Sequence, residues 1–238
     1  MFEINPNLNT KKLRKDFKKN GSVQIFDFLT QESAGTIYNF LNSGMPEDWW
    51  YTAVRHSGNE GYLKGAPAFK RKPENFQEIE NLERHANKSF VDGGFCYSFD
   101  RTIGNHDEDC RCEECEFRKF LNSEGTIELL SFITGMNIEK TGEVFASRYR
   151  SGQFLSPHLD QKKGKVGFVY NITKNWKPQY GGGLHFLSDD HNTVTKAVFP
   201  TFNRVTVFNI AHDGVPHFVS HVAPGITEKR ISFAGWFK

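Results

Sequence analysis

The sequence has few cysteines, little net charge and no long apolar stretch. Its 238 residues include 4 cysteines, and 30 Lys and Arg residues against 28 Asp and Glu residues give a formal net charge of +2. So balanced a charge produces no overall field that would favour nucleic acid or an anionic membrane. No apolar run approaches the roughly 20 residues of a membrane span, and the first residues lack the pattern of a signal peptide. We therefore expect a soluble cytoplasmic protein with neither membrane nor nucleic-acid partners.

Aromatic residues, by contrast, are abundant. They make up 14% of the chain, with 23 Phe, and the length suits one sizeable core. We predict a single domain over residues 1–238, in which residues 1–142 form a support of helices and strands. Its predicted elements are a strand at 22–28 and helices at about 30–41, 73–86 and 117–132, the last interrupted near 123–125.

From residue 143 onward the pattern changes to short β-branched and aromatic runs separated by Gly, Pro, Asn and Asp. Such runs are typical of strands in an all-β sandwich or barrel. The predicted strands are 143–150, 165–173, 183–187, 204–210, 217–222 and 229–237. We predict a mostly β (α+β) protein whose core, residues 143–238, is a jelly roll, or double-stranded β-helix, supported by the N-terminal helices.

A histidine and an aspartate follow a strand-like run at His158 and Asp160. Residues two apart on an extended strand point to one face, so both side chains can reach a single ion. Two imidazoles and one carboxylate leave half of an octahedron open, which suits an Fe(II) that binds a chelating co-substrate and dioxygen. The spacing alone is a weak signal, and a second imidazole is required.

Two downstream histidines, His217 and His221, compete for that position. Alternation along a strand puts both on one face, so the residues alone leave the choice open. Further on, Arg230 and Ser232 share a face of the last predicted strand. An arginine fork beside a hydroxyl is suited to binding a buried dicarboxylate.

These motifs together resemble the prolyl-4-hydroxylase-like branch of the Fe(II)/2-oxoglutarate-dependent oxygenases. The resemblance covers residues 143–238, with weaker similarity in the N-terminal support. It is carried by His158-x-Asp160, Tyr170 six residues before Trp176, GGGLHF at 181–186, PTFNRVTVF at 200–208, His217-x-Val219, Arg230-x-Ser232 and GWF at 235–237.

The resemblance implies an enzyme that uses Fe(II), 2-oxoglutarate and O₂. It implies His158, Asp160 and His217 as iron ligands, because Val219 and Val222 follow His217 as they do the family's distal ligand. His221 stays the alternative, since its spacing to the arginine is also acceptable.

For the co-substrate, the resemblance implies a salt bridge from Arg230, with Tyr170 and Ser232 as hydrogen-bond donors and Tyr149 as a further pocket residue. The retained carboxylate of Asp160 favours hydroxylation over halogenation.

A cluster of thiols lies outside these motifs. His106, Cys110, Cys112 and Cys115 fall within ten residues and could bind zinc, with Cys96 as an alternative fourth ligand. Reduced surface thiols are the competing interpretation, because the spacing lacks paired C-x-x-C motifs.

The substrate is left open by the sequence. The first hypothesis is a prolyl or similar residue in a protein or peptide, and the second is a free amino acid or small metabolite. A non-catalytic metal-binding jelly-roll module is the alternative from another class. The sequence gives no prediction of the oligomeric state.

Overall fold

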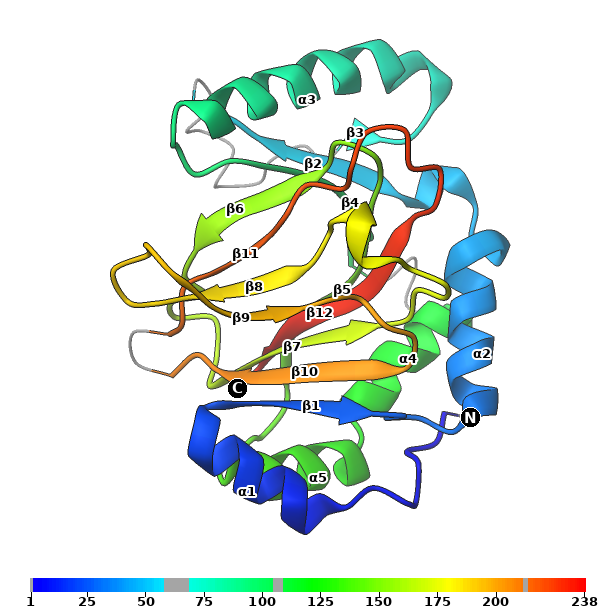
Figure 1. Ribbon diagram of the computed structural model, residues 1–238. Helices are drawn as coiled ribbons and strands as arrows, with labels where there is room; N and C mark the ends of the chain where they lie inside the picture. Colours follow the sequence, from blue (N-terminus) through cyan, green and yellow to red (C-terminus); the bar gives the residue numbers. More distant parts are fainter. Residues whose placement is uncertain (1, 58–68, 105–108, 212–213) are drawn as a thin grey trace.

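One antiparallel sheet forms the centre of the molecule (Figure 1). The computed structural model describes residues 2–57, 69–104, 109–211 and 214–238. Its main path runs β1-β10-β7-β12-β5-β4-β6-β11-β8-β9, and β2 pairs with β4 and β3. The strands are β1 Ser22–Phe26, β2 Tyr51–Arg55, β3 Phe69–Lys70, β4 Tyr97–Arg101, β5 Thr141–Tyr149, β6 Phe154–His158, β7 Val166–Asn171, β8 Leu184–Leu187, β9 Val194–Val198, β10 Arg204–Asn209, β11 His217–Val219 and β12 Arg230–Phe237.

The sheet curls so that its two ends face each other. Phe186 on β8 and Phe208 on β10 are far apart in the strand order, yet their ring centroids lie 5.3 Å apart. An apolar cluster that also contains Phe145, Leu184 and Val219 fills the space between the two halves. This curled half-barrel is the predicted jelly roll.

Helices pack against the outside of the sheet. They are α1 Thr10–Asn20, α2 Gln31–Asn39 with a π-helical turn at Phe40–Gly44, α3 Phe76–Val91, α4 Glu113–Leu121 and α5 Glu124–Thr134. In Figure 1, α1 and α5 lie beside β1 at the bottom of the view, and α3 lies above β2. The Thr30 side chain caps α2 by accepting a hydrogen bond from the Ser33 backbone N–H. No helix in the described ranges is long and apolar enough to cross a bilayer.

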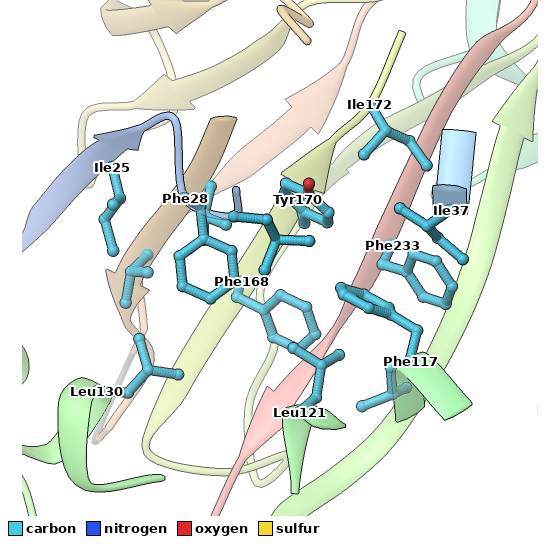
Figure 2. Close-up of a cluster of buried hydrophobic side chains, with 14 of the residues drawn as sticks. Ile25, Phe28, Ile37, Phe117, Leu121, Leu130, Phe168, Tyr170, Ile172 and Phe233 are labelled. Carbon is cyan, nitrogen blue, oxygen red and sulfur yellow. The ribbon is translucent and has the colours of Figure 1, made fainter. Parts of the chain in front are cut away.

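The larger apolar core lies between the sheet and the helices α1, α2, α4 and α5 (Figure 2). Phe117 and Leu121 from α4 and Ile37 from α2 meet Phe233 of β12 there. Burying aromatic side chains of this size is the main favourable contribution to folding. The outer face of β12 is thereby held in place.

Strand β12 separates this outer core from the interior of the curl. Ile231, Phe233 and Phe237 face the helices. Arg230, Ser232, Ala234 and Trp236 instead line an interior cavity. Because side chains alternate along a strand, β12 places Arg230 and Ser232 in the cavity while its other face is apolar.

The first 142 residues contribute to this sheet as well as supporting it. Strand β1 pairs with β10, and β4 lies between β5 and β6. The predicted boundary at residue 143 is thus not a boundary within the sheet. The prediction of a single domain stays a prediction.

Candidate active site

Two histidines and an aspartate converge inside the curled sheet. One ligand atom from each of His158, Asp160 and His217 lies within 4.8 Å of the others. His158 Nε2 is 3.7 Å from Asp160 Oδ1, and His217 Nε2 is 3.5 Å from Oδ2 of the same carboxylate. Such a group has the size and donor types of a site for one divalent cation.

Strand pairing brings the two histidines together. His158 at the end of β6 is the antiparallel partner of His217 at the start of β11. Each Nδ1 lies at hydrogen-bond distance from the carbonyl oxygen two residues earlier, 3.0 Å to Ser156 and 2.9 Å to Val215. A proton on each Nδ1 satisfies these carbonyls and leaves both Nε2 lone pairs directed at the shared site.

Charge in this group favours a bound cation. Burial lowers the pKa of His158 to about 4, His217 acts in the same direction, and Asp160 opposes them. Burial raises the pKa of Asp160, but hydrogen bonding and charge interactions with His217, together with His158 and a hydrogen bond from Trp236, leave it below its ordinary value. At neutral pH His158 is neutral and Asp160 is ionised, which is the protonation state that metal binding requires.

His221, the alternative third ligand, lies elsewhere. Its ring stacks on Phe154 at 4.1 Å and meets Phe90 at 4.5 Å, and its Nε2 is 3.2 Å from Asn87 Oδ1. Strand β11 ends at Val219, so the alternation that would have kept both histidines on one face stops before His221. The structure therefore brings His217, and not His221, to the group.

A second polar group of the cavity centres on Arg230. This side chain is buried, with Nη1 3.3 Å from Ser232 Oγ and Nη2 3.5 Å from Asn171 Oδ1. Its guanidinium lies over the ring of Tyr149 at 4.8 Å. Within the described part of the chain no carboxylate forms an ion pair with Arg230, and the buried Nε of Arg230 and Nδ2 of Asn171 have no hydrogen-bond partner.

A buried arginine without a counter-ion is costly, and burial lowers the pKa of Arg230, with Tyr149 acting in the opposite direction. Its remaining donors are suited to an incoming carboxylate.

Both groups open into one cavity of about 80 Å³. His158, Asp160 and His217 contribute to its wall, as do Arg230 and Ser232. Its remaining lining is largely aromatic and aliphatic, which keeps the interior poor in water. The cavity thus holds a cation site and an anion site together.

The structure places the two predicted tyrosines in different parts of the molecule. Tyr149 lines the cavity, and burial raises its pKa to about 12, with Arg230 opposing, so it is a neutral hydroxyl at physiological pH. Tyr170 does not line the cavity. Tyr170 lies in the outer core (Figure 2), where its hydroxyl donates to Asn203 Oδ1 at 2.9 Å. On β7 it points away from the cavity, while its neighbour Asn171 reaches Arg230.

Asn171 and Trp236 were missed by the sequence analysis. Asn171 pairs with Ser232 in the β7–β12 register, and Trp236 follows Arg230 and Ser232 on the same face of β12. Alternation from Arg230 would have indicated Trp236. Asn171 could be found only once the pairing of β7 with β12 was known.

The predicted zinc residues are partly brought together. One sulfur from each of Cys110, Cys112 and Cys115 lies within 4.8 Å of the others. Burial raises the pKa of Cys112 to about 12, and hydrogen bonding with the other two thiols contributes. Cys96 is buried and is not part of this group, and His106 lies outside the described residues.

Comparison with known proteins agrees with this geometry. Residues 144–238 match the family model of the 2OG-Fe(II) oxygenase superfamily. This segment is therefore similar to the 2OG-Fe(II) oxygenase superfamily. The resemblance seen in the sequence is thereby confirmed.

Two relatives of the chain carry the name prolyl 3-hydroxylase. The chain is 26% identical to prolyl 3-hydroxylase OGFOD1 of Mus musculus over 113 residues, which cover 45% of this chain and 20% of the relative. The Xenopus laevis protein of the same name is 28% identical over 113 residues, 45% of this chain and 22% of that protein. The chain thus matches about a fifth of the length of these curated relatives.

A solved structure extends the likeness over nearly the whole chain. A Pseudomonas putida prolyl-4-hydroxylase superposes with a TM-score of 0.62 at 17% identity, covering 96% of this chain and 98% of the other. At this identity the superposition establishes the fold.

Proposed function

We propose that this protein is an Fe(II)- and 2-oxoglutarate-dependent dioxygenase that hydroxylates a C–H bond of a prolyl or similar residue in a protein or peptide. The observation that carries the proposal is the juxtaposition, in one cavity, of a His-Asp-His group with a buried arginine that has no carboxylate partner among the described residues. A dicarboxylate that chelates a metal at one end needs both sites.

Each group has a definite role in this proposal. His158, Asp160 and His217 would hold Fe(II) through two imidazole nitrogens and one carboxylate oxygen. Arg230 binds the distal carboxylate of 2-oxoglutarate, and the Ser232 hydroxyl and Asn171 amide complete the hydrogen bonds. With Fe(II) and O₂ bound, 2-oxoglutarate is oxidised to succinate and CO₂ while one oxygen atom enters the substrate C–H bond.

The chain's own residues also orient the metal ligands. The backbone carbonyls of Ser156 and Val215 fix the tautomers of the two histidines. Trp236 lines the same cavity as Asp160 and helps to keep the pKa of this carboxyl below its ordinary value. Pre-arranged ligands of this kind lower the reorganisation required when metal and co-substrate bind.

An exposed aromatic side chain lies beside His158. Phe95 is 37% exposed, and its ring centroid lies 5.6 Å from that of His158. The guanidinium of Arg55 lies over the Phe95 ring, 4.8 Å from its centroid. An aromatic side chain next to a metal ligand offers a surface on which a prolyl ring can pack.

The names of the relatives support the prolyl class of substrate. The two relatives matched over 113 residues are prolyl 3-hydroxylases, and the Pseudomonas putida structure is a prolyl-4-hydroxylase. A hydroxylase of a free amino acid uses the same metal chemistry and is distinguished by its product.

The substrate is tested by mass spectrometry of cell-lysate peptides and metabolites incubated with iron, 2-oxoglutarate and O₂. We expect a gain of one oxygen atom on peptides that share a prolyl or similar residue, and no gain with the Asp160→Ala variant. Oxygen gain confined to free amino acids or other metabolites would contradict the peptide assignment. Phe95→Ala should raise KM for the peptide and preserve uncoupled succinate formation.

A further inference from the structure

Three cysteines gather at the start of α4, away from the cavity. Cys110 and Cys112 precede the helix, and Cys115 lies in its first turn. None of them lines the cavity that holds the His-Asp-His group. Their sulfur atoms lie within 4.8 Å of one another, although the three residues span a helix boundary. The three therefore form a cluster independent of the proposed iron site.

We propose that Cys110, Cys112 and Cys115 bind a zinc ion that stabilises the N-terminal end of α4. Zinc binds thiolates at about 2.3 Å in a tetrahedron, which places sulfur atoms roughly 3.8 Å apart. The observed limit of 4.8 Å is met by shifts of about 1 Å or less. Water or another side chain completes the tetrahedron.

Ligand chemistry separates this cluster from the site inside the sheet. Three soft thiolates favour zinc, whereas two imidazoles and a carboxylate with open positions favour Fe(II). Three thiolates leave one negative charge on the zinc complex. The N-terminus of α4 carries a partial positive charge that stabilises it.

Acidic neighbours of the cluster are engaged by cations. Glu114 is buried and forms an ion pair with Arg118 at 2.6 Å, and Glu116 pairs with Lys119 at 2.8 Å. Arg111, between two of the cysteines, lies 3.6 Å from Glu116. These pairs reduce the repulsion between the carboxylates and a thiolate-rich site.

The location of the cluster gives the metal a structural role. Phe117, two residues after Cys115, packs on Phe233 of β12 and Tyr170 of β7, with ring centroids 4.5 Å and 5.5 Å away. The opposite faces of these two strands carry Ser232 and Asn171 of the cavity. Zinc at the start of α4 would therefore support the strands that hold the co-substrate site from behind.

Metal content of the purified protein tests the proposal. Zinc can also occupy the iron site, so the measurement is made in a His158→Ala, His217→Ala background. We expect about one zinc ion per chain there, near-complete loss on adding Cys112→Ser and Cys115→Ser, and retention on adding Cys96→Ser as the control. Retention of zinc after the cluster substitutions, or absence of zinc in the starting background, would overturn the proposal.

Two further measurements keep the test decisive if the serine variants fail to fold. Co(II) added to the same background should give the visible bands of a tetrahedral thiolate site with sulfur-to-metal charge transfer. Cys112→His, which supplies another zinc ligand, should retain the metal and the fold. A Co(II) spectrum without thiolate charge transfer, or an intact mass lower by two hydrogens because the thiols form a disulfide, would contradict a zinc site.

Discussion

His158 and His217 are directly opposed on neighbouring antiparallel strands, with ring centroids 4.3 Å apart and both Nε2 atoms near Asp160. Residues 59 positions apart in the sequence thus form one ligand group because β6 and β11 pair (217 − 158 = 59). Backbone hydrogen bonds at both Nδ1 atoms hold the two rings in this arrangement.

Replacing His217 and His221 one at a time tests which of them is the third metal ligand. We expect His217→Ala to abolish Fe(II) binding and uncoupled succinate formation, because a bidentate remnant holds the metal weakly. His221→Ala should preserve both, since His221 packs between Phe154 and Phe90 outside the ligand group. Fe(II) titration under anaerobic conditions and succinate release measure the two effects. A normal iron affinity in His217→Ala would show that another residue completes the site.

Arg230 should increase the affinity for 2-oxoglutarate while lowering the stability of the protein without co-substrate. Arg230→Met keeps much of the side-chain volume but removes the charge, so we expect the 2-oxoglutarate Kd to rise about 30-fold or more, from a loss of at least about 2 kcal/mol. The same change removes a buried guanidinium that has no carboxylate partner in the described residues. The variant without co-substrate should therefore be as stable as the parent or more stable.

Calorimetric binding and thermal melts measure these two quantities. Ser232→Ala serves as the matched control, with a smaller loss of affinity. A strong fall in stability of Arg230→Met with unchanged Kd would contradict the role of Arg230.

The two tyrosines should respond in opposite ways. Tyr149→Phe removes a hydroxyl from the cavity and should weaken 2-oxoglutarate binding. Tyr170→Phe loses one hydrogen bond to Asn203, so it should lower the free energy of unfolding by about 1 kcal/mol without changing the Kd. Denaturant unfolding and co-substrate titration of both variants check this contrast. A weakened Kd for Tyr170→Phe with unchanged stability would return Tyr170 to the site.

Asp100 should make stability depend on pH. It is buried between arginines, and although burial raises its pKa, Arg150, Arg148 and Arg71 lower it well below the ordinary range. Its stabilising contribution is therefore complete above the unfolded pKa of about 3.9 and is lost as the pH falls towards the folded pKa. Asp100→Asn removes the buried carboxylate shared by the three arginines and leaves them paired with Glu47 and Glu83, so it should cost about 3 kcal/mol or more at pH 7.

Urea unfolding between pH 7 and pH 3 measures this effect. The difference between the parent and Asp100→Asn should stay constant down to about pH 5 and shrink below about pH 4. Asp16→Asn, which breaks the exposed pair with Lys12, should change stability by less than about 1 kcal/mol. A difference that grows on acidification would contradict the assignment.

The sequence predicts the strands in which β-branched and aromatic residues clearly alternate with other residues, and it misses strands without this pattern. β12 and β10 were predicted because β-branched and aromatic residues alternate there, whereas β9 is mostly exposed and β2 begins at the end of the aromatic run 49–51. His217 could be separated from His221 only by family pattern, because the end of β11 is set by its pairing with β6 and β8. The face on which Tyr170 lies likewise depends on register with β10 and β12.

The most direct test of the account is anaerobic addition of 2-oxoglutarate to the Fe(II)-loaded protein, followed by visible absorption. Chelation of the metal by the keto acid gives a metal-to-ligand charge-transfer band. We expect the band in the parent protein, its loss in Asp160→Ala, and a requirement for much higher 2-oxoglutarate in Arg230→Met. Folded, iron-loaded parent protein that shows no band at saturating 2-oxoglutarate would contradict the assignment of this cavity.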